Sequence, residues 1–321
     1  MQKMAILCSG GDVSGMNAAL KRFVEYTLRH NITPFFVHGG YEGLIDGRIK
    51  EADYSDVAGI ITRGGTIIGS ARSKRFLEPR YRAQAAKNLE KHGIEALVVL
   101  GGEGSFKGMQ KLSQESNLAF AGIPATIDND IAGTEYSLGV DTALNVIKCA
   151  IDAVRDTASS FERAFVIETM GRDCGYLALV SALTSGAEMC LVPEVPYDLK
   201  TYASRFLKEK QKGRSYFLAI VSEALHNTES IREWFETTIG IEARSVVLGH
   251  TQRGGNPTVH DRLMASRFVT HAVDGLLEGK KRSVVCYNDG GFNHKSIDEI
   301  AFEPYRINAD LLKMAQEYNR A

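Results

Sequence analysis

Apolar runs of strand length alternate with amphipathic stretches of helix length along almost the whole of this 321-residue chain. We expect buried strands at residues 5–8, 96–100, 118–123, 165–167, 217–221, 245–248 and 284–287. Between them, Val140, Leu144, Ile147, Ile151 and Val154 recur at spacings of three and four residues, which is one face of a helix. This alternation predicts α/β layers built on largely parallel sheets.

The length of the chain predicts more than one domain. A chain of 321 residues is longer than a single hydrophobic core usually supports. No repeat, low-complexity tract or proline-rich linker separates two halves. We therefore expect two α/β domains joined by several short crossings of the chain.

Composition and charge exclude several classes of protein. Hydrophobic residues make up 44% and charged residues 24% of the chain, and the net charge is −1, so nothing indicates a nucleic-acid or membrane partner. No segment is typical of a signal peptide or a membrane span. The five cysteines are Cys8, Cys149, Cys174, Cys190 and Cys286. Because they are odd in number and widely spaced, they predict reduced thiols in a cytoplasmic protein and no structural zinc.

Two carboxylates, Asp128 and Asp130, follow the apolar run at residues 118–123. If that run is a buried strand closed by Pro124, both carboxylates lie at its carboxyl end, where open α/β sheets bind ligands. A general base and a metal ligand would be useful there. The alternative is an Asp-rich turn that caps the next helix.

Glycine-rich turns follow two other predicted strands. Residues 9–12, Ser-Gly-Gly-Asp, have the free backbone amides of an anion site. They match neither the dinucleotide fingerprint, because Asp12 replaces its second glycine, nor a P-loop. Residues 101–105, Gly-Gly-Glu-Gly-Ser, place Glu103 between glycines, where it could hold Mg²⁺ beside phosphate. The alternative there is a plain turn in which Ser105 caps the following helix.

Arginines beside glycines or at strand ends form a third group. Arg63, Arg72, Arg172 and Arg253 all have this context. Guanidinium groups bind phosphate bidentately, and a neighbouring glycine lets the ligand approach. Any one of them could form a surface salt bridge instead, but together with the two glycine-rich turns they favour a phosphate site.

These motifs, in this order and spacing, resemble the phosphofructokinase family, whose members phosphorylate fructose 6-phosphate at its 1-hydroxyl. The resemblance extends from residue 8 to residue 255 and is carried by residues 126–130, Thr-Ile-Asp-Asn-Asp, 170–172, Met-Gly-Arg, and 250–255, His-Thr-Gln-Arg-Gly-Gly. It implies two Rossmann-like α/β/α domains with largely parallel sheets. It also implies a larger nucleotide-binding domain, 1–138 plus 251–300, and a smaller sugar-phosphate domain, 139–250 plus 301–321.

The resemblance assigns roles to individual residues. Asp128 would be the base, with Thr126 and Asp130 beside the transferred phosphoryl group, and Arg172 would stabilise its charge. The nucleotide would be held by Gly11, Arg72, Ser73, Gly102, Glu103, Gly104 and Ser105, with Mg²⁺ at Glu103. The sugar phosphate would be bound by Thr126, Ile127, Asp128, Arg163, Met170, Gly171, Arg172, Glu223, Arg244, His250, Thr251, Gln252 and Arg253. Arg163 and Arg244 match arginines that reach a neighbouring subunit's site, which implies a homotetramer.

Three positions bear on the phosphoryl donor. Glu103 stands where the family usually has Asp, and its extra methylene moves the carboxylate by about 1 Å. Ala125 stands where ATP users usually have Gly and pyrophosphate users Lys. Gly104 matches the ATP users. We therefore expect ATP as the donor; the alternatives are a pyrophosphate-dependent enzyme or a catalytically weak sugar-phosphate-binding relative.

A regulatory site is also implied by the resemblance. Lys21, Arg155, Glu188, Lys212 and Arg214 match positions at which bacterial members bind ADP or phosphoenolpyruvate. Two other positions differ, because the family pattern has Arg where this chain has Glu25 and Tyr54. A carboxylate facing an anionic effector reverses the local charge. We therefore expect weak or altered allosteric control.

Overall fold

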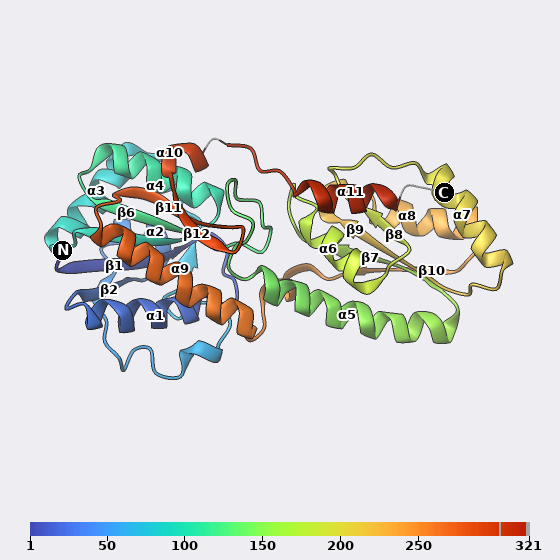
Figure 1. The fold of residues 1–321 in the computed structure, drawn as a ribbon, viewed down its shortest axis with the longest axis horizontal. Coiled ribbons are helices and arrows are strands. Elements are labelled where there is room, and N and C mark those ends of the chain that lie inside the picture. Colours follow the sequence, from blue (N-terminus) through green and yellow to red (C-terminus); the bar gives the residue numbers. More distant parts are fainter. Residues whose placement is uncertain (302, 319–321) are drawn as a thin grey trace. The chain divides into compact units, whose positions relative to one another are not determined.

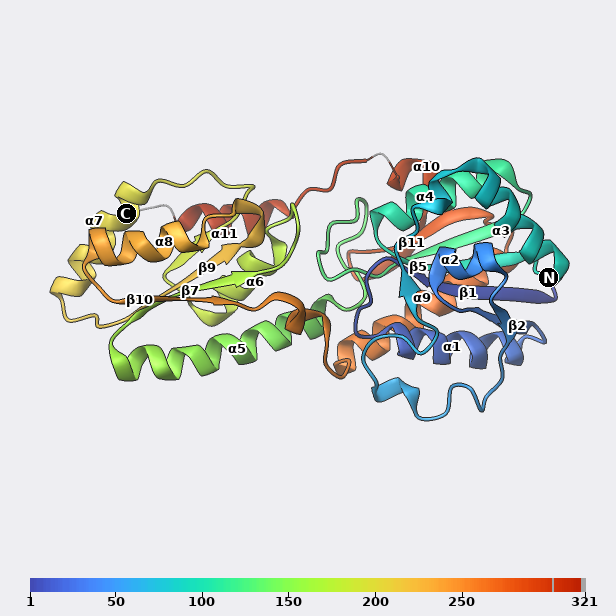
Figure 2. The same ribbon diagram turned by 180° about the vertical axis from the view of Figure 1, so that it is seen from behind.

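The computed structural model describes residues 1–301 and 303–318, and the chain divides into two compact units (Figures 1 and 2). Unit 1 comprises Met1–Thr142 and Arg253–Tyr305, and unit 2 comprises Ala143–Gln252 and Arg306–Ala321. The chain therefore passes between the units three times, as several short crossings would require. The nucleotide and sugar-phosphate roles expected for two domains stay predictions.

Unit 1 is built on an eight-stranded sheet in the order β12-β11-β6-β5-β1-β2-β3, with β4 paired to β1. Its strands are β1 (Lys3–Ser9), β2 (Thr33–Val37), β3 (Ile49–Glu51), β4 (Ser70–Ala71), β5 (Ala96–Gly101), β6 (Ala119–Pro124), β11 (Arg282–Asn288) and β12 (Gly291–Ser296). The central pairs are parallel; β3 and β12 are antiparallel to their neighbours at the two edges. Every residue of β5 and β6 is buried, as expected for parallel strands with both faces covered.

Helices cover both faces of this sheet (Figure 1). They are α1 (Met16–Arg29), α2 (Gly40–Asp46), α3 (Pro79–Lys91), α4 (Glu103–Glu115), α9 (Val259–Leu277) and α10 (Ile297–Ile300). Helices α1 and α9 pack together on one face, and α3, α4 and α10 lie on the other (Figures 1 and 2). The predicted α/β layers are therefore confirmed in this unit.

Unit 2 has a four-stranded, all-parallel sheet in the order β10-β7-β9-β8. Its elements are β7 (Ala164–Thr169), α6 (Tyr176–Ser185), β8 (Met189–Leu191), α7 (Leu199–Gln211), β9 (Phe217–Ser222), α8 (Thr228–Trp234), β10 (Ala243–Val247) and α11 (Ala309–Glu317). Helix α5 (Val140–Phe161) begins in unit 1 and runs along this sheet on the face opposite α7 and α8 (Figures 1 and 2). Its length agrees with the predicted helical face at residues 140–154.

The core of unit 2 is aromatic. Phe206 of α7 stacks on Phe217 of β9, with ring centroids 4.5 Å apart, and on Phe235 at 5.7 Å. Trp234 is partly buried and packs edge-on against Phe235. Offset and edge-on contacts of this kind stabilise a core beyond the area they bury.

Strand β10 departs from the sequence prediction. We expected residues 245–248 to be a buried strand, but β10 is the edge of its sheet and most of its residues are partly or fully exposed, Val247 to 62%. The prediction was wrong because strand order, which decides what lies at an edge, is not encoded in local hydrophobicity. No helix among residues 1–301 and 303–318 is long and apolar enough to cross a membrane.

Candidate active site

The strand order of unit 1 reverses between β1 and β5. From β1 the chain continues to β2 on one side, whereas β5 and then β6 lie on the other side. Ligands of open α/β sheets bind outside the carboxyl ends of the strands at such a reversal. The two glycine-rich turns follow β1 and β5, and the Thr126–Asp130 turn follows β6, so the structure brings all three to this edge.

The turns after β1 and β5 contact each other. The Ser105 hydroxyl donates to Ser9 Oγ at 2.8 Å. Gly10 has a φ of 86°, and a Cβ built on it would lie 3.6 Å from Ser105 Oγ. Gly102 caps α4 without a side-chain bond. The alternative in which Ser105 caps the helix is therefore wrong, because its hydroxyl joins the two turns instead.

Glu103 begins α4 and its side chain is 48% exposed. It forms an ion pair with Lys107, one helical turn later. Gly104 is exposed, and a Cβ there would meet nothing within 4 Å. The helix start thus presents an accessible carboxylate and open space beside backbone amides, which suits a metal-bound phosphate.

No group of three or more His, Cys, Asp or Glu side chains in the described part of the chain could hold a metal ion alone. Mg²⁺ in kinase sites usually keeps several waters and is held by one or two carboxylates together with substrate phosphates. A single accessible carboxylate such as Glu103 fits that pattern, in which the ion would arrive with the nucleotide.

The Thr126–Asp130 turn is held by its own side chains. Asp128 is 5% exposed, and its backbone N–H donates to Thr126 Oγ1 at 3.2 Å. Asn129 has a left-handed backbone, with φ of 51°; its Oδ1 accepts from Ser137 N at 2.9 Å and its Nδ2 donates to Glu135 O at 3.1 Å. Helix α5 begins only at Val140, so the alternative in which these aspartates cap a helix is wrong.

Thr126 also contacts the turn after β5. A Cβ on Gly102 would lie 3.7 Å from Thr126 Cβ, and Ala125 N–H donates to Gly101 O at 3.0 Å. The acidic turn and the Glu103 turn are therefore adjacent, as catalysis on a metal-bound phosphate would need.

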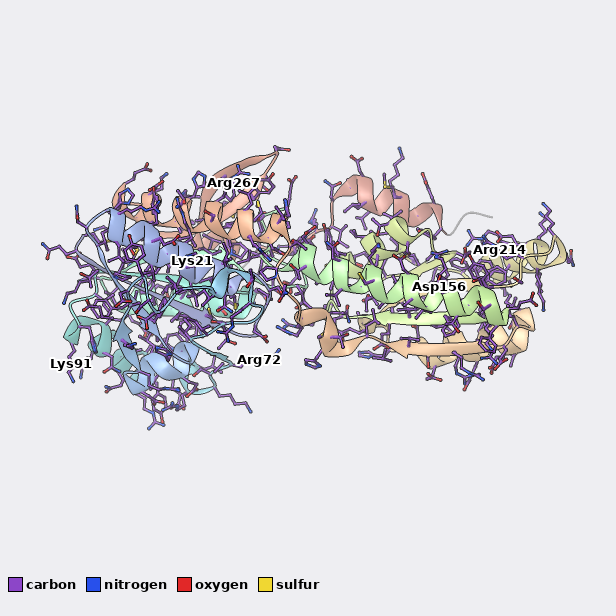
Figure 3. The ribbon with its side chains drawn as sticks, turned by 90° about the horizontal axis from the view of Figure 1, so that it is seen from below. Lys21, Arg72, Lys91, Asp156, Arg214 and Arg267 are labelled. Carbon is purple, nitrogen blue, oxygen red and sulfur yellow. The ribbon has the colours of Figure 1, made fainter. Side chains whose placement is uncertain are left out.

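Arg72 and Ser73 follow β4 in unit 1. Arg72 is exposed (Figure 3), whereas the Ser73 hydroxyl donates to Glu42 and accepts from Phe76 N at 3.1 Å. Arg75 donates to the same Glu42 carboxylate, with a 2.7 Å bond from Nε. These bonds lower the pKa of Glu42, the Ser73 bond most, so this carboxylate stays charged and fixes the loop. No sequence motif indicated the part played by Glu42.

Arg253 lies against the first glycine turn. Its Nε and Nη2 donate to Asp12 O at 3.3 and 3.2 Å, and a Cβ on Gly11 would be 1.6 Å from Nη2. Gly11, which is expected at the nucleotide, and Arg253, which is expected at the sugar phosphate, are thus neighbours within unit 1.

Unit 2 gathers most of the residues expected at the sugar phosphate at the carboxyl ends of β7, β9 and β10. Met170–Arg172 follow β7, Glu223 follows β9, and His250 lies just after β10. Glu223 Oε1 accepts from Gly171 N at 3.1 Å and Arg172 N at 2.8 Å. Arg172 is exposed with a left-handed backbone, φ 53°, so Glu223 holds the loop that presents it.

Two of the expected contact residues have buried side chains. Gln252 is 1% exposed; its Oε1 accepts from Met170 N at 3.1 Å and its Nε2 donates to Gly249 O at 3.0 Å. Ile127 is likewise 1% exposed. The Gln252 amide therefore ties the turn after β10 to the turn after β7. In contrast, His250 and Thr251 are exposed.

The chain matches a known protein family over most of its length. The phosphofructokinase family model matches residues 3–276. The chain belongs to the phosphofructokinase family. Across 99% of its length it is 67% identical to an ATP-dependent 6-phosphofructokinase of Sulfurovum sp. and 60% identical to one of Sulfurimonas denitrificans, covering 98% and 100% of those proteins.

Solved structures of the family agree with the fold. A phosphofructokinase from Saccharomyces cerevisiae superimposes with a TM-score of 0.86 at 33% identity over 94% of this chain, which spans 45% of the yeast chain. A pyrophosphate-dependent phosphofructokinase from Marinobacter aquaeolei gives a TM-score of 0.85 at 19% identity and shows the fold alone.

Arg163 and Arg244, which the resemblance implies reach a neighbouring subunit's site, lie at the other end of the unit 2 sheet. Arg163 precedes β7 and Arg244 is near the start of β10. Both form ion pairs with Glu242. A strand of β7's length spans about 17–20 Å, so these arginines lie far from Arg172, which follows the same strand.

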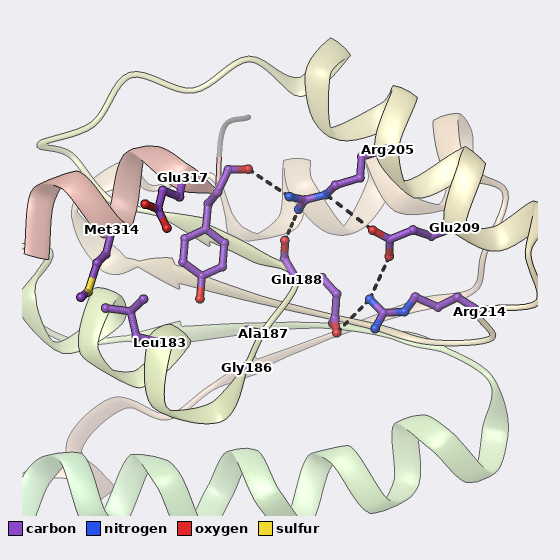
Figure 4. A pocket seen from close by; sticks show the side chains of 10 residues that line it. Leu183, Gly186, Ala187, Glu188, Arg205, Glu209, Arg214, Met314 and Glu317 are labelled. Atoms are coloured by element: carbon purple, nitrogen blue, oxygen red, sulfur yellow. Dashed lines mark hydrogen bonds and ion pairs between the residues drawn. The ribbon is translucent and has the colours of Figure 1, made fainter. Parts of the chain in front are cut away.

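Three of the expected effector residues come together in unit 2. Glu188 and Arg214 line a cavity of about 440 Å³ with Arg205 and Glu209 (Figure 4), and Arg155 donates to the nearby Ser185 O. Arg214 Nη1 contacts Glu188 at 3.1 Å and Glu209 at 2.9 Å. Burial raises the pKa of Glu188. Lys212 directly follows α7 in the same unit, whereas Lys21 belongs to unit 1 (Figure 3).

Proposed function

We propose that this chain is an ATP-dependent 6-phosphofructokinase that transfers the γ-phosphoryl group of ATP to the 1-hydroxyl of fructose 6-phosphate, giving fructose 1,6-bisphosphate and ADP. The observation that carries the proposal is the set of three turns at the β1/β5 reversal: two glycine-rich turns joined by Ser9 and Ser105, beside the turn that bears Asp128. Relatives that match the whole chain at 60–67% identity bear this activity in their names.

Asp128 would act as the general base. The sugar 1-hydroxyl gives its proton to the Asp128 carboxylate while the hydroxyl oxygen forms a bond to the γ-phosphorus of ATP. The bond between the γ-phosphorus and the oxygen that bridges it to ADP breaks, and ADP leaves. Positioning supplies much of the rate in such transfers. The local bonds of Thr126 and Asn129 support this role, because they hold Asp128 in one orientation. Asp130 would lie beside the transferred group.

The nucleotide would lie on the glycine-rich turns. Its phosphates would meet the backbone amides of Gly11 and of Gly102–Ser105, with Arg72 and Ser73 at the loop after β4. Glu103 would hold Mg²⁺, which when bound neutralises phosphate charge. Gly104 leaves the space beside Glu103 open, which supports the assignment.

The sugar phosphate would be bound by the turns after β7, β9 and β10. The guanidinium of Arg172 would stabilise charge on the transferred group, and Arg253 and His250 would bind the substrate. Glu223 and Gln252 would act partly through the backbone of residues 170–172, to which both are hydrogen-bonded.

A homotetramer with shared sites would explain Arg163 and Arg244. Because these arginines lie at the amino ends of β7 and β10, they cannot serve a phosphate held at the carboxyl ends of the same strands. A neighbouring subunit's sugar phosphate is the ligand that suits them. Sedimentation analysis of the purified protein tests the assembly directly.

A coupled assay for fructose 1,6-bisphosphate tests the reaction. Purified protein, fructose 6-phosphate and Mg²⁺ are combined with ATP or with pyrophosphate in parallel. We expect product with ATP only. Product with pyrophosphate only would overturn the choice of donor, and no product from folded protein that binds fructose 6-phosphate would leave a sugar-phosphate-binding relative instead.

Regulation by ADP or phosphoenolpyruvate would be weak. In unit 1, Lys21 is paired with Glu25 at 2.7 Å, one of the two positions at which the chain differs from the family pattern. The Glu25 carboxylate competes with an anionic effector for the Lys21 ammonium, which supports the proposal.

A further inference from the structure

Asp261, in the first turn of α9, is 0% exposed and has no part in the proposed mechanism. A carboxylate is almost never buried completely unless it is fully paired, because desolvation of its charge costs several kcal/mol. Burial accordingly raises the pKa of Asp261, and its hydrogen bonds oppose that change.

Four donors surround the two oxygens of Asp261. Oδ1 accepts from the Tyr136 hydroxyl and from Gly139 N at 2.7 Å, and Oδ2 accepts from Thr142 N at 2.8 Å and from the Thr142 hydroxyl. The Thr142 hydroxyl also accepts from Thr258 N at 3.1 Å, so its own proton is directed to Asp261. All four donors belong to the same seven-residue stretch, 136–142.

This stretch is bound in turn to the Asp128 turn. Ser137 N donates to Asn129 Oδ1, and Leu138 N donates to Pro124 O at 2.9 Å, next to the bridge between Ala125 and Leu138. Residues 124–129 and 135–142 therefore lie side by side. Asp261 is hydrogen-bonded to the 136–142 stretch, and that stretch is hydrogen-bonded through Ser137 to Asn129, the residue next to Asp128.

We infer that Asp261 is a positioning residue for the proposed phosphoryl transfer, acting through residues 136–142 to fix the orientation of the Asp128 turn. The inference rests on the proposed function. Asn129 has a left-handed backbone and is hydrogen-bonded to residues 135 and 137, and the buried carboxylate holds the stretch to which residue 137 belongs. A misplacement of about 1 Å at a reacting group can lower the rate by about a hundredfold.

The chain supplies a matched control on the same helix. Tyr26 of α1 donates to Asp274 Oδ1 of α9 at 2.7 Å, which is the same kind of phenol–carboxylate bond as that of Tyr136 to Asp261. None of the turns that carry expected site residues includes Tyr26 or Asp274. Tyr26→Phe and Tyr136→Phe thus each delete one phenol–carboxylate bond to α9, of which only the second touches the Asp261 cluster.

The first experiment compares wild type, Tyr136→Phe, Tyr26→Phe and Asp261→Asn by steady-state kinetics with ATP and fructose 6-phosphate and by thermal unfolding. We expect Tyr136→Phe to lower kcat about tenfold, and Asp261→Asn about a hundredfold, with KM values within about twofold. Tyr26→Phe should keep the wild-type kcat. Equal kcat for the two Phe variants at temperatures where both are folded would overturn the inference.

A double-mutant cycle separates positioning from general stability. In an Asp128→Asn background the base is absent, so Tyr136→Phe should lower the residual kcat by less than about twofold. The same proportional loss in both backgrounds would show a structural effect only and overturn the inference. If Asp261→Asn fails to fold, the Tyr136→Phe cycle still decides. An inactive wild type would instead refute the proposed function.

Discussion

The guanidinium of Arg253 lies where a side chain of residue 11 would be: an ideal Cβ on Gly11 is 1.6 Å from Nη2 and 2.5 Å from Cζ. The backbone of Gly11 is not left-handed, so alanine can adopt its conformation, and the only obstacle to an alanine side chain is the contact with Arg253. Because the clashing atoms end a flexible side chain, Arg253 can move aside at small cost in stability.

Gly11→Ala should therefore displace Arg253 and leave the fold intact. We expect kcat/KM for fructose 6-phosphate to fall at least tenfold, about 1.4 kcal/mol of transition-state stabilisation, while Tm stays within about 2 °C. Steady-state kinetics and calorimetry measure both. Gly291→Ala, at the start of β12, is the control, since a Cβ there meets nothing closer than 3.7 Å. Wild-type kcat/KM in Gly11→Ala would contradict the role of the contact.

Asp128→Asn should lower kcat by about 10²–10⁴-fold, the range for loss of a positioned base. The amide keeps the shape of the side chain but accepts no proton. Binding of fructose 6-phosphate, measured by titration calorimetry, should stay close to that of wild type. Turnover near the wild-type rate would refute Asp128 as the base.

The Glu103 carboxylate should determine how much Mg²⁺ the enzyme requires, and its ion pair with Lys107 should weaken Mg²⁺ binding. Glu103→Gln should raise the half-saturating Mg²⁺ concentration at least tenfold. Lys107→Ala should lower it about twofold, since an exposed i,i+4 pair contributes only about 0.3–0.5 kcal/mol. The matched control is Lys148→Ala, which breaks the Lys148–Asp152 pair on α5. An unchanged Mg²⁺ requirement in Glu103→Gln would place the ion elsewhere.

ADP should change the half-saturating fructose 6-phosphate concentration by less than about fivefold, the lower end of the range for allosteric coupling. Glu25→Ala frees the Lys21 ammonium, which now pairs with Glu25 at 2.7 Å, and should strengthen the response. Saturation curves with and without ADP measure it. A strongly sigmoidal wild-type curve that ADP straightens would disprove weak control.

Three partly buried histidines should lower the thermal stability as the pH drops below about 6.5. Burial lowers the pKa values of His38, His271 and His294 in the folded protein, so the unfolded chain binds more protons in this window and acid favours unfolding. His294→Gln should reduce the fall in Tm between pH 7 and 5.5, whereas His30→Gln, at an exposed position, should not. An equal change in Tm between pH 7 and 5.5 for His294→Gln and for wild type would contradict the contribution of His294.

Local sequence pattern predicted most strands because parallel strands with both faces covered read as continuous apolar runs. It identified β6 and its end at Pro124, and with it the place of Asp128. It failed for β10, because residues 245–248, Ser-Val-Val-Leu, resemble a buried run although the strand, Ala243–Val247, lies at an edge.

The candidate site was predictable where one motif supplies several groups, as in residues 101–105 and 126–130. The supporting bonds were not predictable, because they join residues far apart in the chain. Gln252 to Met170, Arg253 to Asp12, and Asp261 to residues 136–142 all depend on topology. Each is a single polar residue with no repeating signal, so nothing nearby in the sequence marks its partner.

The ion pairs of Glu242 with Arg163 and Arg244 have a consequence for handling the protein. If the guanidinium groups of Arg163 and Arg244 complete a neighbouring subunit's site, a dissociated subunit keeps its fold. Its Arg163 and Arg244 then neutralise only its own Glu242. Specific activity would then depend on protein concentration. A dilute stock would lose activity within the time of dissociation, regain it on concentration, and show no change in far-ultraviolet circular dichroism throughout.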